Sequence, residues 1–121
     1  MSKILLVDDD PSFQLLVRSL FRSAGHQVLS ASDTDEGLNL ARNMAPDLIL
    51  MDVRLPGSGM DGWQVARILK SDTTLQHIPI IMVTASYDAD HDARAAKLGC
   101  EAVFMKPFNV VEFREFVQRF L

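Results

Sequence analysis

The segment of residues 47–53 constrains the fold of this chain more than any other, because four consecutive apolar residues fill its centre. Successive residues of a strand point to opposite faces of a sheet, so this run would be buried on both faces. Strands buried on both faces are typical of parallel sheets that helices cover on either side. The segment therefore predicts an α/β fold around a parallel sheet.

Four more short apolar runs alternate with amphipathic segments, which carry apolar residues at helical spacing, as Phe13, Leu16 and Val17 do. The predicted strands are residues 4–7, 27–31, 47–53, 79–84 and 102–105. The predicted helices begin after the capping pair Asp10-Pro11, cover residues 38–44, 63–69 and 88–98, and begin again after Asn109. This order predicts five βα units with helices on both faces of one sheet.

Length and composition bound the kind of protein. A chain of 121 residues predicts a single domain, residues 1–121, with no output domain. The net charge of −4 argues against a surface that binds nucleic acid directly. One cysteine cannot form an internal disulfide, and no apolar run approaches the roughly 20 residues of a membrane span. We therefore expect a cytoplasmic domain without a membrane partner.

Polar residues follow the predicted strands at the edge where ligands bind parallel sheets. Asp8 and Asp9 follow the first strand, Asp52 the third, Thr84 the fourth and Lys106 the fifth. If the first and third strands are neighbours, the carboxylates converge, and two of them about 5 Å apart repel by roughly 3 kcal/mol. A proton or a hard cation such as Mg²⁺, Mn²⁺ or Ca²⁺ would relieve this repulsion. A metal, a lysine and a hydroxyl around one carboxylate could hold a phosphoryl group.

Five segments make the chain resemble the receiver domain of two-component response regulators over essentially its whole length. These segments are residues 4–10, 46–52, 55–56 with 60–62, 83–85 and 106–108, and their order and spacing match the family. The resemblance implies a flavodoxin-like, doubly wound (βα)5 fold with five parallel strands in the order 2-1-3-4-5. It also implies a signalling switch that catalyses only its own phosphorylation and dephosphorylation, rather than an enzyme.

The resemblance also implies a role for each residue at the strand ends. Asp52 would be the phosphoacceptor, and the donor would be a phosphohistidine on a sensor histidine kinase or a histidine phosphotransfer protein. Thr84 and Lys106 would bind the phosphoryl group, and Pro107 would follow a cis peptide bond. The ligands of Mg²⁺, or of Mn²⁺, would be Asp8, Asp9, Asp52 and the backbone carbonyl of Arg54.

Phosphorylation would rearrange the surface that extends from the fourth strand to the last helix, where a second copy or an output partner would dock. In the family, an aromatic residue three positions before the lysine couples this surface to the threonine. Val103 occupies that position here, so the usual aromatic swing cannot occur. Compared with the family, the loop of residues 55–62 is about two residues longer, and Arg54 and Ser86 occupy positions that tune phosphoryl lifetime in other members.

Other functions were weighed against the phosphoacceptor switch. Val103 favours a receiver-like interaction scaffold that acts independently of phosphorylation, whereas the complete site disfavours it. A Mg²⁺-dependent hydrolase with an aspartyl nucleophile is disfavoured because position 54 is Arg rather than a second Asp.

Two further clusters have two interpretations each. The acids around His91 could bind metal, but acids commonly precede a helix because of its dipole. Five phenylalanines between positions 104 and 120 form either core or a partly exposed docking patch, with Val110, Phe113, Val117 and Phe120 expected to face inward.

Overall fold

The computed structural model describes residues 1–57, 59–86 and 88–121, and its centre is one parallel sheet of five strands. The strands are β1 (Lys3–Val7), β2 (Gln27–Ala31), β3 (Leu48–Asp52), β4 (Ile80–Thr84) and β5 (Ala102–Met105). Their order across the sheet is β2-β1-β3-β4-β5, and every neighbouring pair is parallel. The predicted doubly wound, flavodoxin-like fold is therefore confirmed.

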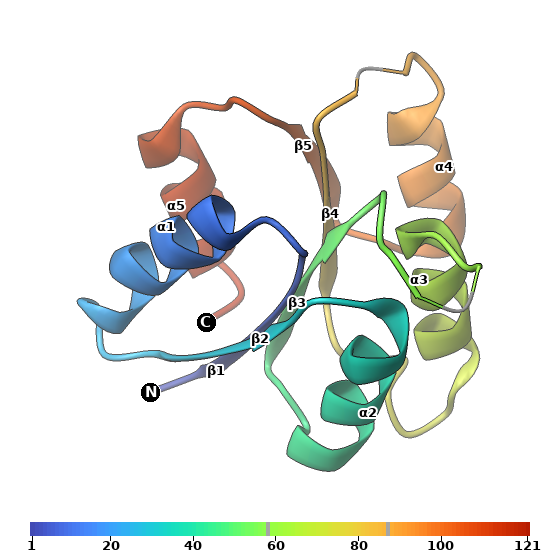
Figure 1. The fold of residues 1–121 in the computed structure, drawn as a ribbon, viewed down its shortest axis with the longest axis horizontal. Coiled ribbons are helices and arrows are strands. Elements are labelled where there is room, and N and C mark those ends of the chain that lie inside the picture. Colours follow the sequence, from blue (N-terminus) through green and yellow to red (C-terminus); the bar gives the residue numbers. More distant parts are fainter. Residues whose placement is uncertain (58, 87) are drawn as a thin grey trace.

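Five helices cover the two faces of this sheet, as Figure 1 shows. They are α1 (Pro11–Arg22), α2 (Thr34–Met44), α3 (Gly62–Ser71), α4 (His91–Leu98) and α5 (Val110–Gln118). Helices α1 and α5 lie on one face, to the left of the sheet in Figure 1, and α2, α3 and α4 lie on the other. None of the helices in the described parts of the chain is long and apolar enough to span a membrane.

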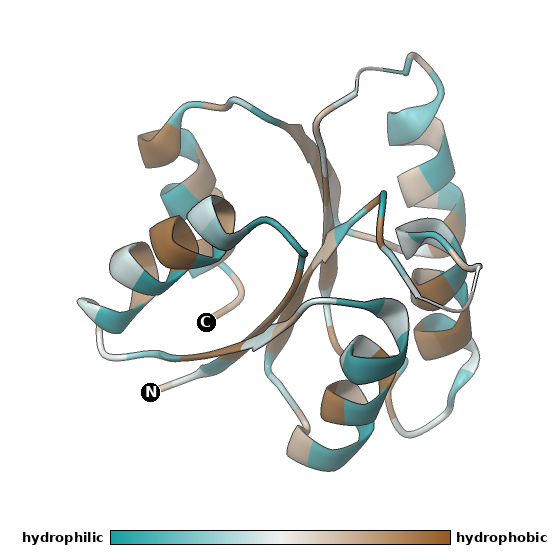
Figure 2. Ribbon diagram, in the orientation of Figure 1, coloured by the Kyte–Doolittle hydropathy of each residue, from teal (hydrophilic) through white to brown (hydrophobic). Residues whose placement is uncertain are grey.

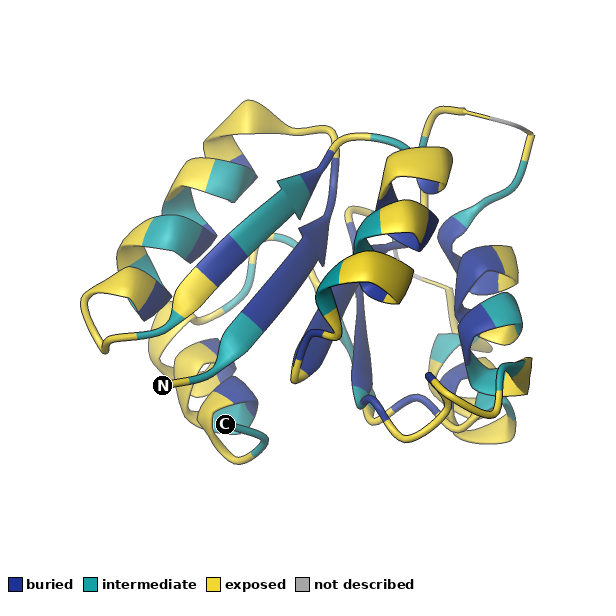
Figure 3. Ribbon diagram, turned by 90° about the horizontal axis from the view of Figure 1, so that it is seen from below, coloured by how far each residue is buried: buried dark blue, intermediate teal, exposed yellow. Residues whose placement is uncertain are grey.

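The strands divide the core into two layers. Every residue of β3 and β4 is buried, as the continuous apolar run in the sequence predicts. Alternate residues belong to opposite layers, so that Ile4 and Leu6 pack with α1 and α5 while Leu5 and Val7 pack with α2 and α3. Figure 2 shows the apolar strands inside the polar outer surfaces of the helices, and Figure 3 shows the same division as buried and exposed residues.

Capping residues fix where the helices begin. Asp10 caps α1, since its carboxylate accepts a hydrogen bond from the Ser12 N–H at 2.9 Å, and this agrees with the prediction. Asn109 caps α5 in the same way through the Glu112 N–H at 3.0 Å. Val110, expected to face inward, is instead 38% exposed in the first turn of α5.

Helix α4 begins three residues later than predicted, at His91 rather than at residue 88. The Asp88 carboxylate accepts a hydrogen bond from the Asp90 N–H at 2.9 Å, and the Asp88 carbonyl accepts one from the His91 N–H at 3.1 Å. These bonds make a local turn, which competes with helical geometry for short polar side chains. Ser58, which belongs to the loop predicted to be long, lies outside the described residues.

Candidate functional site

The order of the strands brings three carboxylates together. Asp8 directly follows β1, Asp52 ends β3, and the two strands are neighbours in register, with Val7 opposite Met51. One carboxylate oxygen from each of Asp8, Asp9 and Asp52 lies within 4.8 Å of the others. Asp8 is fully buried and Asp52 is 8% exposed, whereas Asp9 is open to solvent. Two of the three charges are therefore largely removed from water.

The Asp52 carboxyl group is strongly perturbed by these surroundings. Burial, together with the nearby Asp8 carboxylate, raises the pKa of Asp52 to about 6. The Arg54 N–H, which donates to Asp52 Oδ1 at 3.2 Å, and the positive charge of Lys106 oppose this rise. Asp52 therefore sits where a negative charge is costly and where a nearby positive charge would be strongly favoured.

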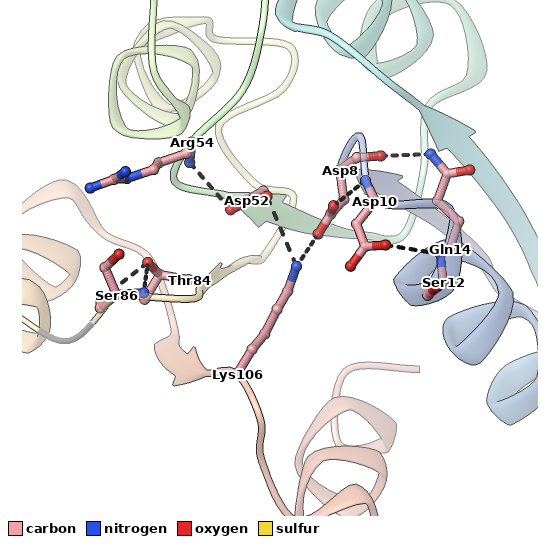
Figure 4. Close-up of polar contacts among 9 residues, drawn as sticks. All are labelled: Asp8, Asp10, Ser12, Gln14, Asp52, Arg54, Thr84, Ser86 and Lys106. Atoms are coloured by element: carbon pink, nitrogen blue, oxygen red, sulfur yellow. Dashed lines mark hydrogen bonds and ion pairs between the residues drawn. The ribbon is translucent and has the colours of Figure 1, made fainter.

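Lys106 reaches into the cluster from the end of β5. Its Nζ donates to Asp8 Oδ2 at 2.7 Å and lies 4.0 Å from Asp52 Oδ2, so the ammonium stands between the two buried carboxylates (Figure 4). The same Nζ lies 4.2 Å from the centre of the Phe13 ring, over its face. The peptide bond between Lys106 and Pro107 is cis.

Thr84 ends β4 and is 2% exposed, but its hydroxyl forms its hydrogen bonds with Ser86 rather than with Asp52. Thr84 Oγ1 accepts a hydrogen bond from the Ser86 N–H at 3.1 Å and donates to the Ser86 carbonyl at 3.2 Å. Figure 4 shows this pair on the far side of Asp52 from Asp8. The hydroxyl is thus engaged with the loop that follows β4.

The remaining predicted residues lie around this centre. The side chain of Arg54 points away from Asp52 into solvent (Figure 4). Val103 is half-buried in β5, and it borders a hollow of about 200 Å³ together with Thr84 and His91. A small side chain therefore stands at the position where the resemblance leads one to expect an aromatic ring.

Two residues close to the site were missed by sequence reasoning. A methyl group on Gly62 would overlap the carbonyl oxygen of Asp52, and the Gly62 N–H donates to the Val53 carbonyl at 2.7 Å. Helix α3 can therefore begin directly against the end of β3. The signal available in the sequence was a glycine immediately after the capping residue Asp61. Phe13, whose ring lies against Lys106, is in the first turn of α1 and was singled out only as part of an apolar helix face.

The donor set fits a hard divalent cation. All three clustered side chains offer carboxylate oxygens, the ligands that Mg²⁺ and Mn²⁺ prefer. Among the residues that the structure describes, this is the only group of acids, histidines or cysteines whose ligand atoms come close enough to share one ion. The acids beside His91 do not form such a group, although His91 Nε2 lies 3.9 Å from Asp88 Oδ2.

Comparisons with known proteins point to one family. The family model of the response regulator receiver domain matches residues 4–118. The chain is 37% identical over 118 residues to the polar-differentiation response regulator DivK of Brucella anthropi, covering 98% of this chain and 94% of that protein.

Solved structures agree with this match. The chemotaxis protein CheY4 of Vibrio cholerae has a TM-score of 0.88 at 29% identity, covering 100% of this chain and 99% of that one. The receiver domain of the sensor histidine kinase PA1611 of Pseudomonas aeruginosa, solved with a magnesium ion in its active site cleft, has a TM-score of 0.84 at 31% identity and covers 98% and 96% of the two chains. The chain therefore belongs to the family of response regulator receiver domains.

Proposed function

We propose that this receiver domain accepts a phosphoryl group on Asp52 in a Mg²⁺-dependent reaction and thereby switches its interaction surface. The donor is a phosphohistidine on a sensor histidine kinase or a histidine phosphotransfer protein. The observation that carries the proposal is the position of the Asp52 carboxylate, which lies within 4.8 Å of two other acids and 4.0 Å from the Lys106 ammonium. We further propose that residues 1–121 act as one domain in the cytoplasm.

The reaction needs Asp52 as a nucleophile. Because its pKa is about 6, the side chain is mainly ionised above neutral pH. A carboxylate oxygen attacks phosphorus as the bond from phosphorus to the histidine nitrogen breaks, and the imidazole leaves. Lys106 places a positive charge where negative charge gathers on the phosphoryl oxygens, which is the main contribution a protein makes to phosphoryl transfer.

The cation would be held by Asp8, Asp9 and Asp52, together with the backbone carbonyl of Arg54. Bound there, Mg²⁺ or Mn²⁺ would supply further positive charge next to the phosphoryl oxygens. Asp8 already holds Lys106 at 2.7 Å, and its other oxygen accepts a hydrogen bond from the Asp10 N–H at 2.8 Å. Asp8 is therefore fixed in place by residues of this chain.

The change of the interaction surface would depend on the Thr84 hydroxyl. For its hydroxyl to turn toward a phosphoryl group on Asp52, it must release its hydrogen bonds with Ser86. The loop between β4 and α4 is then free to take a second position, which changes the surface formed by β4, α4, β5 and α5. Val103 cannot contribute a swinging ring, so this loop carries the coupling to a second copy or an output partner.

Incubation with Mg²⁺ and acetyl phosphate tests the proposal. The wild type is expected to gain one alkali-labile phosphate, and Asp52→Asn is expected to gain none. Asp47→Asn is the matched control, because Asp47 is an exposed acid that immediately precedes β3, at the opposite end from Asp52. No phosphate on the wild type, or equal phosphate on Asp52→Asn, would refute the proposal.

A further inference from the structure

A hollow of about 450 Å³ opens between α3 and α4, away from the cluster of carboxylates. We call it the α3–α4 groove. It is lined by Trp63, Gln64 and Arg67 from α3 and by Arg94, Lys97 and Leu98 from α4. These helices lie next to each other on the same face of the sheet (Figure 1).

The α3–α4 groove concentrates positive charge on an acidic protein. Arg67, Arg94 and Lys97 are all exposed, and no carboxylate lines the groove. Within residues 1–57, 59–86 and 88–121, none of these three cations forms an ion pair with an acid. Since the chain as a whole carries a charge of −4, three unpaired cations around one hollow form a local field of the opposite sign.

Helical spacing sets the direction of the side chains that line the groove. Arg94 and Lys97 are three residues apart, so they point to the same side of α4, and Gln64 and Arg67 do the same on α3. The Arg94 guanidinium lies 5.0 Å from the ring centre of Trp63, which is only 2% exposed. A guanidinium stacked on a fixed ring keeps its N–H groups directed outward, where they can hold a carboxylate.

We propose that the α3–α4 groove binds an acidic segment of a partner protein. Its three exposed cations stand on two facing helices, Arg67 on α3 and both Arg94 and Lys97 on α4, an arrangement that suits carboxylates distributed along a peptide. The half-buried Leu98 supplies apolar surface on the α4 side of the groove. A compact phosphate ligand is more typically held by N–H groups that converge on one point, as at a helix N-terminus.

The α3–α4 groove adjoins a second hollow that lies between it and the carboxylate cluster. Trp63 and Arg94 also line this second hollow of about 280 Å³, which Arg54, Thr84 and Ser86 border. A segment bound in the groove would thus contact side chains that adjoin the loop after β4. No residue that lines the groove belongs to the carboxylate cluster, so binding is expected of the unphosphorylated protein.

A fluorescent peptide that carries Glu at helical spacing around Leu tests the proposal by anisotropy at low salt. The wild type is expected to bind it saturably, and at least tenfold more tightly than the analogue in which every Glu is Gln. Arg67→Glu combined with Arg94→Glu should weaken binding about tenfold or more, because two attractions become repulsions. Lys97→Gln, a milder change, should weaken it about twofold to threefold.

The matched control is Arg22→Glu combined with Arg114→Glu, which changes the net charge equally on exposed positions of α1 and α5. It is expected to alter the affinity by less than about twofold. Backbone amide shifts on titration with the peptide should be confined to α3, α4 and their flanking loops. Equal losses in the control, shifts on other elements, tighter binding of pyrophosphate than of the peptide, or a second copy of the chain filling the groove would each overturn the proposal.

Discussion

The two faces of the sheet are packed in different ways. All seven phenylalanines of the chain belong to the layer under α1 and α5, and none belongs to the layer under α2, α3 and α4. The second layer is built from aliphatic side chains, Trp63 and small residues such as Ala41 and Ala66. The first layer therefore depends on large rings that fill space, and the second depends on helices that approach the strands closely.

Each layer contributes a different part of the site. The aromatic layer extends to Phe13, whose ring lies under the Lys106 ammonium. On the other face, Gly62 brings α3 against the Asp52 backbone. Truncation should therefore be most harmful in the aromatic layer, and enlargement should be most harmful at the start of α3.

Phe113→Ala is expected to have the largest effect, a loss of about 4 kcal/mol in the free energy of unfolding. The side chain is fully buried, and its ring lies close to four others, those of Phe108, Phe104, Phe21 and Phe13. Urea unfolding measures the loss. Phe116→Ala, which removes a half-buried ring of the same helix, is the control and should cost about half as much. Equal losses at the two positions would contradict this account of the aromatic layer.

Gly62→Ala is expected to cost about 3 kcal/mol, because the new methyl group would overlap backbone atoms of β3 that cannot move aside. Gly37→Ala is the matched comparison in α2. Its methyl group would come within 2.9 Å of a Val7 methyl, a side chain that can shift, so we expect a loss of about 1 kcal/mol. Thermal or urea unfolding of both variants measures the two losses of stability. A smaller loss of stability at Gly62 than at Gly37 would be incompatible with the close approach of α3 to β3.

Asp52→Asn is expected to stabilise the protein by about 1–2 kcal/mol near pH 7.5 in the absence of divalent cations. The folded protein raises the pKa of Asp52 to about 6 from 3.8, so it binds this proton more tightly than the unfolded chain does. The stabilisation from that proton is complete below pH 3.8 and is lost as the pH rises through about 6. Water near the carboxylate reduces the effect below the full value of about 3 kcal/mol.

Urea unfolding at several pH values measures this difference, with Asp47→Asn as the control. The gap between wild type and Asp52→Asn should widen from pH 4 to pH 7 by about the stated amount. A gap that stays constant over this range would show that Asp52 does not titrate with a raised pKa.

Phe13→Leu is expected to have the smallest effect, about 1 kcal/mol, because it removes the ring beneath the Lys106 ammonium while keeping an apolar side chain. If the proposed function holds, phosphorylation by acetyl phosphate should slow about fivefold. Phe13→Tyr retains the ring face and should keep most of the rate, which separates this role from packing alone. Equal slowing of phosphorylation in the Phe13→Leu and Phe13→Tyr variants would show that Phe13 acts only through packing in the core.

The strands and the order of elements could be predicted because they rest on local patterns. Residues 48–51 are apolar without a break, which fixes β3 as a central strand, and Asp10-Pro11 marks the start of α1. Convergence of Asp8 with Asp52 required only that β1 and β3 be neighbours. The predicted start of α4 was wrong because the turn at Asp88 depends on a side-chain hydrogen bond that residue spacing does not reveal.

The support of the site could not be predicted, since it depends on contacts between residues far apart in the sequence. Lys106 and Asp8 are separated by 98 positions, and nothing local shows that the lysine bonds to Asp8 more closely than to Asp52. The overlap expected at Gly62 likewise depends on how α3 packs against β3. The cations of the α3–α4 groove belong to two helices whose relative position only the fold determines.

Two hydrogen bonds join Thr84 to Ser86, so a movement of the Thr84 hydroxyl and a movement of Ser86 are linked. Under the proposed function, whatever draws the threonine hydroxyl toward Asp52 must also release Ser86, so the position of Ser86 and the occupancy of the site would be coupled in free energy. Such linkage is reciprocal. If Asp52 is phosphorylated as proposed, a molecule that favours the released loop would make that phosphorylation more favourable by the same factor by which phosphorylation tightens the molecule's binding, even without touching the carboxylate.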